Sequence, residues 1–187
     1  MGNFIGSSMS FGSVFQKTGF PGASNIGDQF DLGYALYPTT TGGSSWALSE
    51  NPVDLAGTTF FWGASVSIPA VTEAVELDKS GTNTSAIIAA SLDGNAAQAA
   101  TLYTQNNYTG YVLPSYEGAQ KMEIGLVPVV GAIFTPYDTV SFWTSTEKDN
   151  LNAYYFTIRD GTSWIFGYDL KTVPRAVWPI IRYNYQN

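Results

Sequence analysis

Short apolar runs separated by turn-forming residues dominate the first third of the chain. The runs Val14-Phe15 and Tyr34 to Tyr37 are flanked by Gly, Pro, Asn and Asp, which is the pattern of short strands and turns. Pro38 to Ser45 (PTTTGGSS) has the composition of a loop. Thr58 to Ile68 (TTFFWGASVSI) is rich in aromatic and β-branched residues and predicts a further strand.

The middle of the chain changes to an alanine-rich, helical pattern. Thr84 to Ser91 and Asn95 to Thr104 predict two short helices, because alanine has the highest helix propensity and Asp93-Gly94 interrupts it. A third helix is predicted over Tyr116 to Leu126, with Ser115 as its N-cap.

The last third returns to strand-like runs, and a turn of known type joins two of them. Asp160-Gly161 favours a tight hairpin turn, because both residues tolerate left-handed backbone angles. The sequence therefore predicts an α+β fold in which strands are followed by helices and then by antiparallel strands. The strands expected here are Phe142 to Ser145, Tyr154 to Ile158, Trp164 to Tyr168 and Ala176 to Tyr183.

Composition removes several classes of function. The chain of 187 residues has no cysteine and no histidine, which excludes disulfides, thiolate metal sites and the Ser-His-Asp triad. Only 12% of the residues are charged and the net charge is −7, so phosphate backbones and anionic membranes are unfavourable partners. We therefore expect no enzyme, no cofactor, no nucleic-acid binding and no membrane insertion.

The start of the chain differs from the rest in composition. Met1 to Ser13 is rich in Gly and Ser and lacks the basic and apolar regions of a signal peptide. No apolar stretch approaches the roughly 20 residues of a transmembrane helix. Without a repeat, a charge block or a Pro-rich linker, we expect an N-terminal attachment arm at residues 1–20 and a single domain at 21–187.

Segments spread over most of the chain resemble the motifs of one family. FWTSTE at Phe142 to Glu147 is similar to the family's YWSSTE, and the stretches after it are similar to NAWYVxFxxG and KxxxxxVRPVRxF. Trp178 stands where the family often has Arg, and the Trp that precedes the Leu-Pro element is missing. The other matching stretches are GYALYPTTTGGSSW at 33–46, TGYVLPSYEGAQKM at 109–122, NAYYFTIRDG at 152–161 and KTVPRAVWPIIRY at 171–183.

This family is the C-terminal domain of the Legionella collagen-like adhesin, which has paralogues in bacteria and their phages. The resemblance implies a C-type-lectin-like fold, related to that of the formylglycine-generating enzyme, whose activity cannot carry over because it needs cysteines. It implies a binding protein, first as a virion component such as a capsid decoration or head fibre, alternatively as a bacterial surface adhesin for glycans or matrix. The resemblance also favours a homotrimer, located on the virion or at the cell surface.

Aromatic residues of the last third are the candidate ligand-binding set. Tyr and Trp present flat apolar faces with a polar group, which suits both sugar stacking and protein interfaces. The alternative is that most of them build the core, and we expect only one or two to be exposed. Neighbours on a strand face opposite sides, so Tyr154 and Tyr155 are expected to separate. The set is Trp143, Tyr154, Tyr155, Trp164, Tyr168 and Trp178.

Acidic residues offer two weaker hypotheses. The oxygen-rich loop Glu147 to Asn152 has the composition of a calcium site, but Lys148 and the missing lectin calcium motifs favour a structural loop. The pairs Asp28 with Asp31 and Glu73 with Glu76 have the residue type of glycosidase carboxylates, and solvated acids are the commoner case.

Assembly is the last expectation from the sequence. A chain with few charges and many aromatic residues has difficulty covering its apolar surface, and large exposed patches usually mark interfaces. We expect the arm at residues 1–20 to contact other subunits, with Phe4, Ile5 and Phe11 as anchors. Removing it is expected to leave a folded domain that no longer assembles or attaches.

Overall fold

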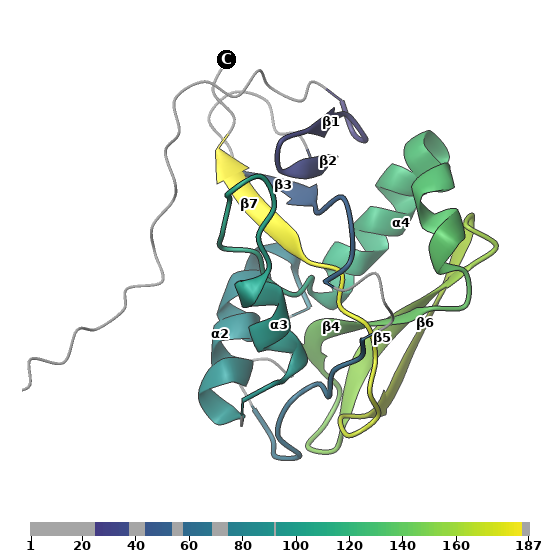
Figure 1. Cartoon of the computed structure of the whole chain (residues 1–187). Coiled ribbons are helices and arrows are strands. Elements are labelled where there is room, and N and C mark those ends of the chain that lie inside the picture. Colours follow the sequence, from purple (N-terminus) through teal and green to yellow (C-terminus); the bar gives the residue numbers. More distant parts are fainter. Residues whose placement is uncertain (1–24, 38–43, 54–57, 69–74, 92, 185–187) are drawn as a thin grey trace, which may run out of the picture.

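The computed structural model describes residues 25–37, 44–53, 58–68, 75–91 and 93–184. Two antiparallel sheets and a group of helices form the molecule, which confirms the α+β class (Figure 1). The predicted arm, its three anchors and the Val14-Phe15 strand lie outside the described residues. None of the helices in the described ranges is both long and apolar enough to cross a lipid bilayer.

The first sheet joins the two ends of the described chain. Its strand order is β1-β2-β3-β7, so the last strand pairs with β3 through Leu48 opposite Ile180 (Figure 1). The strands are β1 (Gln29–Phe30), β2 (Gly33–Tyr37), β3 (Ser44–Leu48) and β7 (Ile180–Asn184).

The second sheet is a meander with the order β4-β5-β6. Its strands are β4 (Ser141–Glu147), β5 (Asn152–Arg159) and β6 (Ser163–Leu170). Asp160 and Gly161 both have positive φ, at 55° and 62°, so the predicted hairpin turn between β5 and β6 is confirmed. Gly161 needs its lack of a side chain as well, because a Cβ there would lie 2.9 Å from Thr135 Oγ1.

The three predicted helices are confirmed, with shifted ends. They are α2 (Ser80–Ala90), α3 (Ala96–Leu102) and α4 (Tyr116–Val130), and the short 3₁₀ segments η1 (Leu77–Lys79) and η2 (Gly131–Tyr137) flank them. Ser115 caps α4 as predicted, since its side chain accepts a hydrogen bond from the Gly118 amide. The helix continues through Gly125 to Val130. The missing side chain at Gly125 leaves room for Ile26 to pack closely against α4, because a Cβ there would lie 3.2 Å from Ile26 Cγ2.

The strand predicted over Thr58 to Ile68 is wrong. Only Phe60 forms a bridge there, with Arg175, and the segment otherwise follows an irregular path. Trp62 of this segment is fully buried, and its Nε1 donates a hydrogen bond to the Thr144 carbonyl at 2.7 Å. Within this segment only Trp62 and Ile68 are buried, while Phe61 and Val66 are exposed, so the apolar composition predicted neither a regular strand nor uniform burial.

Two further strand boundaries differ from the expectation. β3 begins at Ser44, inside a stretch whose Ser and Gly content indicates a loop, because Ser45 is buried beside β7. Conversely, the strand predicted over Ala176 to Tyr183 starts only at Ile180, since Pro179 cannot donate to a ladder. Ala176 forms an isolated parallel bridge with Phe142.

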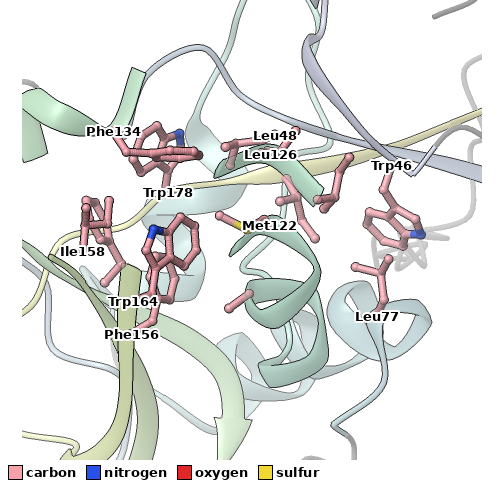
Figure 2. Close-up of a cluster of buried hydrophobic side chains, with 14 residues drawn as sticks. Trp46, Leu48, Leu77, Met122, Leu126, Phe134, Phe156, Ile158, Trp164 and Trp178 are labelled. Atoms are coloured by element: carbon pink, nitrogen blue, oxygen red, sulfur yellow. The ribbon is translucent and has the colours of Figure 1, made fainter. Parts of the chain in front are cut away.

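The main core lies between the two sheets and α4 (Figure 2). Trp164 stacks on Phe156 with ring centroids 4.7 Å apart, and Phe134 meets Trp178 edge to face. Met122 and Leu126 of α4 enter the same cluster from the helix side. A second cluster, around Trp62, Trp143 and the alanines of α3, fills the space on the other face of β4 and β5.

Candidate functional site

The three tryptophans of the candidate set are core residues. Trp143 and Trp178 are fully buried and Trp164 is 7% exposed, so none presents a ring face to solvent. Trp143 Nε1 donates to the Phe60 carbonyl at 2.9 Å, and Trp178 Nε1 donates to the Ser49 carbonyl at 3.0 Å. These side chains thus fasten irregular segments to the sheets, which corrects the hypothesis that they form a ligand platform.

The tyrosines of the set separate onto two faces of the β4-β5-β6 sheet, as alternation along β5 predicted. Tyr154 lies 4.8 Å from the ring of Tyr116 on α4 and 6.3 Å from that of Tyr168. Tyr155 lies on the opposite face, where it packs edge to face against Trp143. Tyr168 is 58% exposed and is the most accessible member of the set.

A cation completes the group on the α4 side of the sheet. Lys148 Nζ lies 5.8 Å from the ring centroid of Tyr154 and 5.6 Å from that of Tyr168, within the range of a cation–π contact. We call Tyr116, Tyr154, Tyr168 and Lys148 the tyrosine cluster. Its members come from the start of α4, from two paired strands and from the turn between β4 and β5.

Strand register explains why the cluster forms. The Asp160-Gly161 turn sets Arg159 opposite Ser163, and counting back along the ladder places Tyr154 directly opposite Tyr168. Directly opposed side chains on one face of a sheet lie within contact distance. Because the sequence predicts this turn, the pairing of Tyr154 with Tyr168 could be deduced from the sequence. The positions of Tyr116 and Lys148 could not, because only the tertiary structure brings α4 and the β4-β5 turn next to this pair.

One exposed aliphatic side chain lies on the same face of β6 as Tyr168. Leu170 lies two residues beyond Tyr168 on the same strand and is 46% exposed. The tyrosine cluster therefore belongs to a partly apolar surface with one nearby cation, which can stack on a sugar ring or pack against a protein.

A buried ion pair lies where β4 ends and the chain leaves β6. Lys171 Nζ lies 3.5 Å from Glu147 Oε2 and donates to the carbonyls of Val66 and Asn150 at 2.8 and 3.1 Å. Burial lowers the pKa of Lys171, against the opposing effect of the Glu147 carboxylate. Glu147 Oε2 also accepts from the Ile68 amide at 2.8 Å, so the pair holds three loops together.

The other face of the sheet carries a stacked arginine. The Arg175 guanidinium lies 3.6 Å from the ring centroid of Tyr155 and pairs with Asp169 at 2.6 Å. Tyr155 covers Gly167, where a Cβ would lie 2.9 Å from the tyrosine Oη. The Tyr155 ring thus contacts Arg175, Trp143 and Gly167 of its own chain and is not a free surface for a ligand.

Both acidic side chains of the oxygen-rich segment at the end of β4 accept hydrogen bonds from protein donors, although Glu147 does so through Oε2 alone. Asp149 Oδ1 accepts from the amides of Leu151 and Asn152, both at 2.9 Å, and hydrogen bonds with Asn152 lower the pKa of Asp149. Glu147 is bound to Lys171. Among the described residues, no group of three or more His, Cys, Asp and Glu side chains is placed to hold a metal ion.

The remaining acidic candidates do not converge. Asp28 accepts from the Asn25 amide at 2.9 Å and so closes a turn before β1, and Asp31 lies in the turn that precedes β2. Glu76 is exposed at the start of η1, and Glu73 lies outside the described residues.

Comparison with known proteins adds no relative: no family model matches the sequence, and no curated protein is significantly similar to it.

Proposed function

We propose that this chain is a non-catalytic binding protein with a C-type-lectin-like domain, and that the tyrosine cluster is its contact surface. The observation that carries the proposal is the position of Tyr168, which is 58% exposed, next to Tyr154 and under Lys148. Aromatic rings held rigidly at a surface lose little entropy on binding, so they are effective anchors for a ligand.

The arrangement of the motif segments supports the lectin-like part of the proposal. The FWTSTE segment meets the KTVPRAVWP segment twice, through the Trp143 amide and the Ala176 carbonyl at 3.1 Å and through the Glu147–Lys171 pair. The TGYVLPS segment meets the terminal strand through the bridge between Val112 and Ile180. Residues that define the resemblance therefore contact one another and form one structural unit.

The ligand class that fits the cluster best is a carbohydrate. The apolar face of a sugar ring stacks on an aromatic side chain, while tyrosine hydroxyls and an ammonium group can meet its hydroxyls. The first location we propose for the protein is a virion, where it would be a capsid decoration or fibre component that binds host-surface glycans. The second setting is a bacterial surface adhesin, and in both the partners include further copies of the chain, with a trimer favoured by the resemblance.

A glycan array with the full chain tests the ligand proposal. Glycans that bind the wild type are expected to bind the Tyr168→Ala and Lys148→Ala variants at least about tenfold more weakly, a loss typical of interface anchors. Phe61→Ala is the matched control, since Phe61 is 55% exposed on the segment before Trp62 and outside the cluster. Equal binding by Tyr168→Ala and the wild type would overturn the assignment of the surface.

The two settings are separated by locating the protein in its source. A virion component sediments with purified particles and resists washing, whereas an adhesin fractionates with the cell envelope. Recovery of the chain in neither fraction would contradict both settings.

A further inference from the structure

Strand β6 is the outer strand of its sheet. Within the described part of the chain it pairs only with β5, along all 8 of its residues and without a register shift. Proteins usually protect such an edge with proline, lysine or a bulge, because its free backbone groups can pair with another strand. β6 reads SWIFGYDL and has none of these protections.

The backbone groups that face away from β5 are occupied only near the two ends of β6. The Trp164 amide donates to Glu123 Oε1 of α4 at 2.8 Å, and the Leu170 amide donates to Asp169 Oδ1 at 2.8 Å. Amides alternate in direction along a strand, so those of Phe166 and Tyr168 face outward as well. Neither of these two amides has an acceptor among the described residues.

Apolar side chains flank this open stretch on both faces of the sheet. Ile165 is 46% exposed on the face of Tyr155, and Tyr168 and Leu170 are 58% and 46% exposed on the face of α4. The one charged side chain of β6, Asp169, is already paired with Arg175 of the same chain. An added strand would therefore gain hydrogen bonds and apolar contact without having to neutralise a free charge.

We propose that β6 pairs antiparallel with β6 of a second copy of this chain, about a twofold axis at Gly167. In that register, Phe166 lies opposite the partner's Tyr168 and Trp164 lies opposite the partner's Leu170. Every cross-strand pair on the α4 face is then apolar or aromatic, and such pairs stabilise a sheet. Gly167 meets its own copy at the axis.

The sequence of the strand itself favours a second copy as the occupant. On the α4 face its residues are symmetric in character about Gly167, with the aromatic Phe166 and Tyr168 next to it and the apolar Trp164 and Leu170 beyond them. On the other face, Ile165 and Asp169 are complementary only in size, and their register is tested below. A twofold interface requires this self-complementarity, because the same patch supplies both sides. The pairing uses only residues 163–170, all of which the structure describes. It also goes beyond the proposed function, since it needs no glycan and gives a twofold dimer in place of the trimer that the resemblance implies.

Charge at position 165 tests the register. The twofold at Gly167 sets Ile165 opposite the partner's Asp169, so Ile165→Asp brings two carboxylates together and Ile165→Lys brings opposite charges together. With the full chain and no ligand, sedimentation equilibrium is expected to show a dimer that Ile165→Asp weakens severalfold and Ile165→Lys does not weaken. Leu102→Asp and Leu102→Lys are the controls, since Leu102 is 80% exposed on α3, and both are expected to leave the dimer unchanged.

Proline at position 168 tests the backbone pairing. Tyr168→Pro removes an amide that is free in the single chain, and proline is tolerated where the amide of an edge strand faces solvent. The variant is expected to raise the dimer dissociation constant at least about tenfold, with circular dichroism unchanged, while Tyr168→Ala keeps the amide and weakens the dimer less. A wild type that stays monomeric at all concentrations, an assembly that survives Tyr168→Pro, or equal effects of the two Ile165 variants would overturn the proposal.

Discussion

Lys171 Nζ lies 3.5 Å from Glu147 Oε2, and both side chains are fully buried. The pair joins the last residue of β4 to the residue that follows β6. Charges are costly to bury, and this pair is supported by carbonyls of Val66 and Asn150 on the lysine and by the Ile68 amide on the carboxylate. The ion pair thus determines how three loops meet beside the tyrosine cluster.

Breaking the ion pair from one side is expected to destabilise the protein strongly. Lys171→Met leaves the Glu147 carboxylate buried without its cation, at a cost of about 3–5 kcal/mol in the free energy of unfolding. Combining it with Glu147→Leu is expected to cost less than the sum of the single variants, because the two residues interact. Urea denaturation measures all three, with Lys121→Met of the exposed Lys121–Glu117 pair as a control that changes little. Additive effects would contradict a coupled pair.

The N-cap of α4 is expected to contribute measurably to stability. Ser115→Ala removes the acceptor of the Gly118 amide, and loss of such a cap costs about 1 kcal/mol. Ser85→Ala is the matched control, because Ser85 lies exposed inside α2, where alanine is the better helix former. Thermal denaturation is expected to rank Ser115→Ala below the wild type and Ser85→Ala at or above it; the reverse order would refute the cap.

Chelation is expected to leave the melting temperature unchanged. The acidic side chains of the loop after β4 already accept protein hydrogen bonds, Glu147 from the Ile68 amide and Asp149 from the Leu151 amide. A bound ion would stabilise the folded state by mass action, so its removal would lower the melting temperature. Scans with EDTA and with added calcium are expected to superimpose, and a drop of several degrees with EDTA would reveal a metal site.

Alkaline pH is expected to destabilise the fold through buried tyrosine. Tyr111 is fully buried, its hydroxyl donates to the Leu32 carbonyl at 2.9 Å, and burial raises its pKa well above 10. Above about pH 10 the unfolded chain releases this proton while the folded chain retains it, so stability falls as pH rises. Tyr111→Phe is expected to be less stable at pH 7 but to lose less stability between pH 9 and 11. Parallel losses in urea denaturation would show that Tyr111 is not responsible.

Local patterns predicted regular elements well and irregular ones poorly. The Asp160-Gly161 turn and the Ser115 cap depend on neighbouring residues alone, and both were predictable. The segment around Trp62 was not, because its path is set by the distant carbonyls of Thr144 and Lys171. Of the aromatic residues there, Trp62 is buried in the core while Phe61 is exposed, so neither follows from strand alternation.

The candidate site shows the same division. Alternation along β5 predicted that Tyr154 and Tyr155 face opposite sides, since it depends only on strand geometry. The burial of Trp143 and Trp178 depends instead on segments that lie far away in the sequence, where the carbonyls of Phe60 and Ser49 accept hydrogen bonds from the two indoles. Composition therefore identified the aromatic set, but only the structure shows that its tryptophans are buried and that Tyr168 is its most accessible member.

Burial of the indole rings also gives the protein an intrinsic optical probe. All 5 tryptophans of the chain lie in the described structure and are buried, namely Trp46, Trp62, Trp143, Trp164 and Trp178. Their fluorescence emission therefore originates in apolar surroundings and shifts to longer wavelength only when the interior opens to water. The tyrosine cluster contains no indole, so a shift of this emission reports opening of the core and not occupancy of that surface.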